Sequence, residues 1–207
     1  MARSPIADRI AGWRLVGWAA ILLCAMFSLI LASAGAGEEG VRMAIRATAR
    51  SSLALFSLAF SASSLWRLRP GAATRWLLDN RRYLGVSFAV SHALHLTAIV
   101  WFARIDPETF AREVDPTALV FGGFAYVVVA AMAATSFDTT AAWLGARAWR
   151  RLHGFGVWYL WFIFTITLLP AATLSFGYFL LASVPLVLLS VRIAAAVRAP
   201  RRAGSPA

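Results

Sequence analysis

Three histidines are the residues of this 207-residue chain whose type and placement could support chemistry. His92, His95 and His153 all fall within long apolar stretches, and none falls in a loop. Ionisable side chains inside a membrane are costly, and they usually face the interior of a helix bundle or a cavity. Neutral imidazole is also the usual axial ligand of haem iron, so these histidines favour a haem site. His92 is three residues from His95 and lies on the same helix face.

Other uses of these imidazoles stay open at the level of the sequence. Each histidine could simply hydrogen-bond a neighbouring helix, as polar groups in membrane bundles do. A metal site other than haem lacks a carboxylate in these stretches to complete it. A small transporter that relays protons through histidines is a weaker reading, because broken helices and midplane acids are missing. Small residues beside His153, namely Gly154 and Gly156, would let a flat macrocycle approach the helix, which favours haem.

Six arginines lie near the predicted ends of apolar stretches. Long arginine side chains in such positions first anchor a helix at the membrane interface. Their second use is to hold anionic groups, such as haem propionates, lipid headgroups or a partner. They are Arg46, Arg50, Arg81, Arg82, Arg150 and Arg151.

The elements that must position the histidines are membrane helices. The chain is 60% hydrophobic with a mean hydropathy of +0.71, and a helix needs roughly 20 apolar residues to cross a bilayer. The sequence predicts an all-α membrane protein, a bundle of about six transmembrane helices in one domain (15–197). A cytoplasmic segment (1–14) precedes it and a disordered cytoplasmic tail (198–207) follows. The predicted spans are about 15–34, 45–66, 84–102, 118–137, 149–169 and 174–197, with Pro170 closing the fifth and Pro185 a kink in the sixth.

The distribution of arginine predicts that both termini are cytoplasmic. Basic residues collect on the cytoplasmic side of short loops. With the N-terminus inside, most of the 20 basic residues fall in inner segments, and tryptophans gather at the inner boundary. The outer segments carry only Arg42, Arg46, Arg50, Arg104 and Arg112. The net charge of +11 therefore reflects membrane topology, and a nucleic-acid partner is not expected. Residues 1–34 could instead be a cleavable signal peptide, although the apolar run is long for one.

Two blocks of sequence resemble a known family. Residues 80–86 (NRRYLGV) and 94–96 (LHL) are similar to the first block of the MsrQ (YedZ) haem-binding membrane subunits. Residues 135–136 (TS), 144–145 (LG) and 149–153 (WRRLH) are similar to the second block. These subunits are part of the wider group of ferric-reductase-like transmembrane domains.

The resemblance implies a bundle that binds haem b and passes electrons across the membrane. His95 and His153 would be the axial ligands of the haem iron, with His92 as the substitute. In MsrQ the acceptor is a periplasmic methionine sulfoxide reductase, so an extracytoplasmic redox partner is expected, in a bacterial inner membrane. Other members of the group carry a cytoplasmic flavin and nicotinamide domain, which this sequence lacks. Electrons would therefore come from quinol or from a separate reductase, and whether flavin takes part is not determined. The chain would be an oxidoreductase subunit without catalytic residues of its own.

One departure from the family pattern concerns the second axial ligand. The family has another histidine 13 or 14 residues after the first on the fifth helix, where this chain has Ile166 and Thr167. Measured from Arg82 and Arg151, His95 and His153 differ in depth by about 16 Å at a rise of about 1.5 Å per residue. A single haem, or none, is therefore an alternative. The rival function is a degenerate family member that serves as a non-catalytic membrane anchor or assembly partner.

Overall fold

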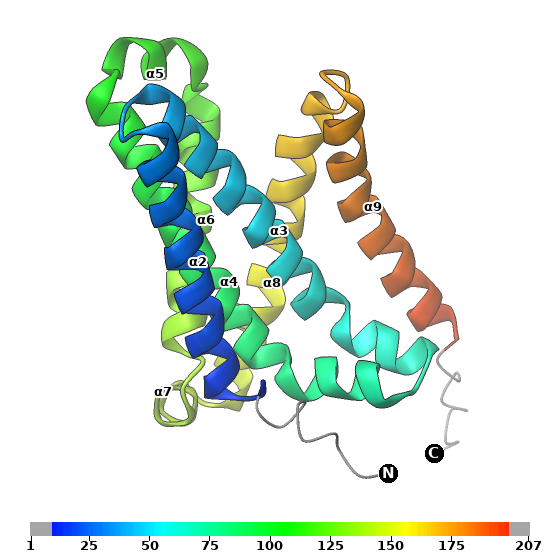
Figure 1. Ribbon diagram of the computed structural model, residues 1–207. Coiled ribbons are helices and arrows are strands. Elements are labelled where there is room, and N and C mark those ends of the chain that lie inside the picture. The colour runs from blue at the N-terminus through cyan, green and yellow to red at the C-terminus, as the bar shows by residue number, and fades with distance from the viewer. Residues whose placement is uncertain (1–9, 199–207) are drawn as a thin grey trace, which may run out of the picture.

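The computed structural model describes residues 10–198, and over this range the chain is helical. Residues 1–9 and 199–207 lie outside the described residues, and with them most of the predicted cytoplasmic segment and tail. Six long helices alternate in direction between two ends of the molecule, and the short helices α5 and α7 mark these opposite ends (Figure 1). The long helices are α2 (Trp13–Ala34), α3 (Glu38–Leu68), α4 (Ala72–Ile105), α6 (Pro116–Ala134), α8 (Ala146–Ala171) and α9 (Phe176–Val197). The prediction of an all-helical protein is confirmed.

Five of these helices are long and apolar enough to cross a membrane: α2, α4, α6, α8 and α9. The chain is therefore a multi-pass membrane protein. Helix α3 has the length but is less apolar, because its first half carries arginines and its second half is rich in serine. Whether α3 makes a sixth crossing, and where the membrane boundaries fall along each helix, stay predictions.

The helix ends follow from local sequence signals. The short helix α5 (Pro107–Glu113) begins with the Asp106 carboxylate accepting a hydrogen bond of 2.9 Å from the backbone N–H of Thr109. Asp115 caps α6 in the same way, through the backbone N–H of Thr117 at 2.6 Å. Each capping aspartate is followed by proline at the first helical position, where a missing N–H costs nothing. The other short helix, α7 (Asp138–Leu144), is separated from α8 by Gly145, whose φ of 79° favours glycine.

Helices α3 and α4 form the tightest pair in the bundle, and polar side chains hold them together. The hydroxyl of Ser91 on α4 lies 2.7 Å from that of Ser51 and 2.9 Å from that of Ser52 on α3. Small residues allow this approach, since Ala44 and Ala98 are both fully buried in the same interface. Ser51 and Ser52, two of the serines of α3, thus contribute to the packing of α3 on α4.

An apolar cluster joins this pair to the later helices. It contains Phe56, Phe60, Phe88, Ala125, Val129, Leu160 and Leu188, which come from α3, α4, α6, α8 and α9. Helix α6 contacts both α4 and α8, and α8 also contacts α9. The two helices that carry the histidines, α4 and α8, both run from the α7 end toward the α5 end (Figure 1).

Candidate functional site

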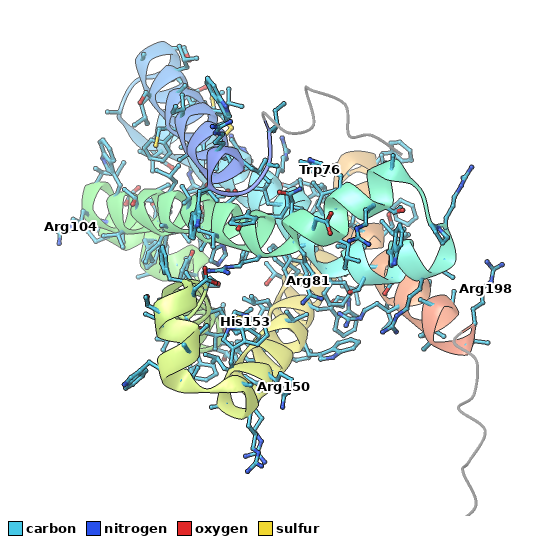
Figure 2. All side chains as sticks on the ribbon, turned by 90° about the horizontal axis from the view of Figure 1, so that it is seen from below. Trp76, Arg81, Arg104, Arg150, His153 and Arg198 are labelled. Carbon is cyan, nitrogen blue, oxygen red and sulfur yellow. The ribbon has the colours of Figure 1, made fainter. Side chains whose placement is uncertain are left out.

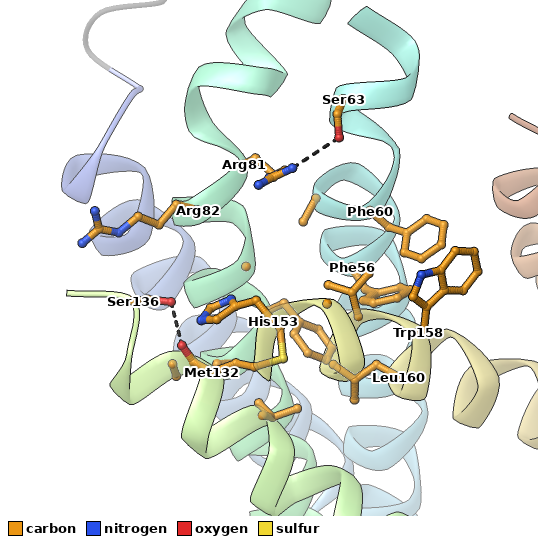
Figure 3. A pocket seen from close by; sticks show the side chains of 18 of the residues that line it. Phe56, Phe60, Ser63, Arg81, Arg82, Met132, Ser136, His153, Trp158 and Leu160 are labelled. Atoms are coloured by element: carbon orange, nitrogen blue, oxygen red, sulfur yellow. Dashed lines mark hydrogen bonds between the residues drawn. The ribbon is translucent and has the colours of Figure 1, made fainter. Parts of the chain in front are cut away.

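A cavity of about 300 Å³ opens among α3, α4, α6, α8 and α9 toward the α7 end of the bundle. Its walls are apolar and aromatic, with Phe56, Phe60, Phe88 and Trp158 among the lining residues. The volume is at the lower end of the range for ligand-binding cavities. His153 lies within this lining, near Met132, Ser136 and Leu160 (Figure 3).

Positive charge surrounds the cavity. Its lining includes four arginines and, among the described residues, no carboxylate: Arg81, Arg82, Arg150 and Arg192. Seen from the α7 end, Arg81, His153 and Arg150 follow one another across the space between α4 and α8 (Figure 2). Such a lining suits a ligand with an apolar body and one or more anionic groups.

These arginines differ in the partners they already have. Arg82 is paired with Asp138 at 2.6 Å, and its side chain leads away from the cavity in Figure 3. Arg81 donates a hydrogen bond of 3.3 Å to the hydroxyl of Ser63. The guanidinium of Arg192 lies over two rings, 4.3 Å from the centroid of Phe60 and 4.8 Å from that of Trp158. Arg81 and Arg192 thus line the cavity and make no ion pair among the described residues.

Two glycines give the cavity room beside His153. A Cβ placed on Gly85 of α4 or on Gly154 of α8 would meet nothing within 4 Å, and both residues line the cavity. Gly156 has a different role, because a Cβ there would collide with the sulfur of Met132 on α6. Of the two glycines that follow His153 in the sequence, Gly154 thus leaves space in the cavity, whereas Gly156 allows the contact between α8 and α6.

The imidazole of His153 is held by groups from two helices. Its Nε2 lies 3.1 Å from the hydroxyl of Thr135, the residue that ends α6. The indole of Trp149, one turn earlier on α8, stacks on the imidazole with centroids 4.1 Å apart. Trp149 is fixed in turn, because its Nε1 donates a hydrogen bond of 2.9 Å to the backbone carbonyl of Thr135.

The other two histidines do not line this cavity. The Nδ1 of His95 lies 3.0 Å from the hydroxyl of Thr48 on α3. His92 stacks on Tyr126 of α6 at 4.5 Å between centroids and lies 5.6 Å from His95. Its Nδ1 is buried with no hydrogen-bond partner among the described groups. The structure therefore brings His92 and His95 together and leaves His153 in a separate environment.

The space opposite His92 is filled by aromatic side chains. Phe164 of α8 lies 6.5 Å from His92, and it also contacts Phe56 at 5.2 Å and Phe88 at 6.2 Å between centroids. Two residues further along α8, the side chains of Ile166 and Thr167 are exposed. The positions where the family pattern has a second histidine thus face away from the packed interior.

Sequence reasoning missed several residues of these sites. Arg192 is one of them, although an arginine within the last apolar stretch is itself a signal for an internal role. Thr48 and Tyr126 carry no sequence signal of their own, because their significance depends on which imidazole each one meets. Thr135 lies in the second motif block, but only the structure shows that it meets His153.

The fold and the cavity define a helical membrane protein with an imidazole-bearing, cationic cavity at one end of the bundle. Three curated proteins are similar to the chain, and each is named as a haem-binding subunit, MsrQ, of a protein-methionine-sulfoxide reductase. The protein from Polaromonas naphthalenivorans is 34% identical over 88 residues, which cover 42% of this chain and 40% of that protein. The protein from Ralstonia nicotianae is 27% identical over 155 residues, 73% of this chain and 67% of that protein. The protein from Azospira oryzae is 30% identical over 88 residues, 42% of this chain and 38% of that protein.

These matches confirm the family resemblance that the two motif blocks predicted: the chain is similar to the MsrQ haem-binding subunits. Two of the three matches span about two fifths of the relative's length. No family profile matches the chain, and no solved structure matches it.

Proposed function

We propose that the chain is a haem b-binding subunit that carries electrons across a bacterial inner membrane, with both termini cytoplasmic and α3 as its sixth span. The observation that carries the proposal is the placement of His153 in a cavity that combines aromatic walls, the two glycines Gly85 and Gly154, and the guanidinium groups of Arg81 and Arg192. The names of the similar proteins support haem as the ligand.

The residues of the cavity fit this cofactor. His153 supplies an imidazole, while Gly85 and Gly154 leave space where a side chain would otherwise stand. Arg81 and Arg192 are placed to neutralise propionates, and the aromatic walls exclude water. When bound, haem supplies a one-electron carrier, and the protein sets its potential through the axial ligand and the surrounding charge.

A single haem near His153 is the form of the proposal that the geometry favours. The predicted partner ligand, His95, belongs to a region of the bundle where His92, Tyr126 and Phe164 already pack together. His95 and His92 remain candidate ligands, and replacing each with alanine tests whether it contributes to haem binding. Quinol or a separate reductase is the proposed electron donor, and an extracytoplasmic redox protein is the proposed acceptor.

Reduced-minus-oxidised spectra of the purified full chain test the proposal. We expect haem to co-purify with the protein from haem-supplied cells and His153→Ala to abolish the haem bands. His95→Ala and His92→Ala report whether α4 supplies a ligand, and Leu96→Ala, an exposed neighbour on the same helix, is the matched control. A well-folded protein without haem would refute the proposal and favour the non-catalytic anchor.

A further inference from the structure

Two threonines meet two of the histidines with the same local geometry. The Thr48 hydroxyl oxygen lies 2.7 Å from the carbonyl oxygen of Ala44, four residues earlier on α3, and 3.0 Å from Nδ1 of His95. The Thr135 hydroxyl oxygen lies 2.7 Å from the carbonyl oxygen of Ala131, four residues earlier on α6, and 3.1 Å from Nε2 of His153. Each hydroxyl thus stands between a carbonyl of its own helix and a ring nitrogen of another helix.

The chemistry of these groups fixes the direction of each hydrogen bond. A hydroxyl has one hydrogen, and a carbonyl oxygen can only accept. At 2.7 Å from a carbonyl oxygen, each threonine hydroxyl must donate there. The ring nitrogen must then be the donor to the hydroxyl oxygen, so Nδ1 of His95 and Nε2 of His153 both carry a hydrogen.

We propose that Thr48 and Thr135 are positioning residues that hold the two imidazoles in opposite tautomers. A neutral imidazole has one N–H and one lone pair, so His95 presents its Nε2 lone pair and His153 presents its Nδ1 lone pair. The hydrogen bond from His153 to Thr135 therefore competes with any iron that approaches through Nε2. This competition rests on the proposed haem function, whereas the tautomers themselves do not.

Thr135 contacts both rings that determine the orientation of the His153 side chain. The carbonyl of Thr135 accepts a hydrogen bond from the indole of Trp149, which stacks on the imidazole, and the hydroxyl of Thr135 contacts the imidazole itself. A change of the ring orientation at His153 thus has to break a contact with Thr135 first.

Nuclear magnetic resonance of the full chain, labelled with ¹⁵N-histidine and kept free of haem in micelles, tests the tautomers directly. The protonated and unprotonated ring nitrogens of a neutral imidazole resonate in separate regions. We expect the hydrogen on Nδ1 of His95 and on Nε2 of His153, with the signals assigned by single histidine substitutions. The reverse tautomer at either residue would overturn the proposal for that residue, and this measurement requires no threonine variant to fold.

Haem titration of Thr135→Val tests the competition. Loss of one net hydrogen bond from the haem-free state should tighten haem binding by about 2- to 10-fold, because Nε2 is no longer held. Thr135→Ser keeps the hydroxyl and should restore wild-type affinity and tautomer. Thr165→Val is the matched control, because Thr165 makes the same bond to the carbonyl four residues earlier, at 2.8 Å to Trp161, without meeting a histidine. Equal affinity of wild type and Thr135→Val, including no binding by either, would overturn the competition.

Discussion

Trp149 stacks on His153 with ring centroids 4.1 Å apart and planes inclined by 21°. The two residues are one helical turn apart on α8, so the helix itself brings the rings together. Thr135, at the end of α6, contacts both rings. Its hydroxyl lies within hydrogen-bond distance of the imidazole, and its backbone carbonyl accepts a hydrogen bond from the indole. The imidazole that lines the cavity is therefore oriented before any ligand arrives.

Removing the indole anchor should loosen this imidazole. Trp149→Phe keeps a ring for stacking but loses the hydrogen bond to Thr135, which contributes about 0.5–1.5 kcal/mol. We expect a modest fall in the thermal midpoint and broader haem bands, and a larger effect from Trp149→Ala. Thermal unfolding in detergent and visible spectra measure the two effects. Equal behaviour of wild type and Trp149→Ala would show that stacking does not orient His153.

Filling the cavity should separate ligand binding from folding. Gly154→Leu places a side chain where a Cβ meets no atom within 4 Å, so the bundle should fold while haem content falls by more than half. Gly156→Ala is the contrasting variant, because its Cβ collides with Met132 and disturbs the contact of α8 with α6. We expect it to lower stability more than Gly154→Leu does. Haem content per folded protein and the thermal midpoint distinguish the two variants.

Arg192 should influence the redox potential of a haem in the cavity. Its guanidinium lies over Phe60 and Trp158, and a nearby positive charge favours the reduced, less positive iron. Arg192→Gln should lower the midpoint potential by about 30–60 mV, which corresponds to an interaction on the order of 1 kcal/mol. Arg192→Lys keeps the charge and should stay close to wild type in a spectroelectrochemical titration. A potential unaffected by either substitution would place the haem away from α9.

An acid-sensitive contact joins α3 to the short helix α5. Arg42 binds Glu113 through hydrogen bonds of 2.7 and 2.8 Å, and these bonds hold the pKa of the Glu113 carboxyl below its usual value. A lowered pKa in the folded state means that the stabilisation is complete above the ordinary pKa of glutamate. It is lost as the pH falls through the lowered value.

The stability of the wild type should therefore fall in acid more steeply than that of Glu113→Gln. Thermal midpoints measured in detergent between neutral and acidic pH provide the comparison. Glu108→Gln, on the same short helix, is the control and should follow the wild-type profile. Identical pH profiles for wild type and Glu113→Gln would show that this contact contributes nothing in solution.

Placing a histidine at position 166, where the MsrQ pattern has one, should not by itself add a haem. The Ile166 side chain is 41% exposed, and the interior near His92 is filled by Phe164. Ile166→His is therefore expected to leave the ratio of haem to protein unchanged. Phe164→Ala combined with Ile166→His opens that interior and gives the matched comparison. A pyridine haemochrome assay measures the ratio, and a higher value for Ile166→His alone would contradict the packing argument.

The sequence by itself determined the elements and their chemical character. Apolar stretches long enough to span a bilayer can satisfy their backbone only as helices, so the all-helical membrane fold follows directly from composition and length. The placement of His92, His95 and His153 inside such helices, and the motif blocks shared with the MsrQ subunits, were equally readable from the chain.

Only the tertiary structure decided which of these residues share a site. Helical periodicity fixes the face on which a residue lies, but the neighbour of that face depends on packing between helices distant in the sequence. That packing places His153 with Arg192 around one cavity and His92 with Tyr126 in another region. It also decides the tautomers, because a threonine hydroxyl acts on a histidine only when two helices bring them within hydrogen-bond distance.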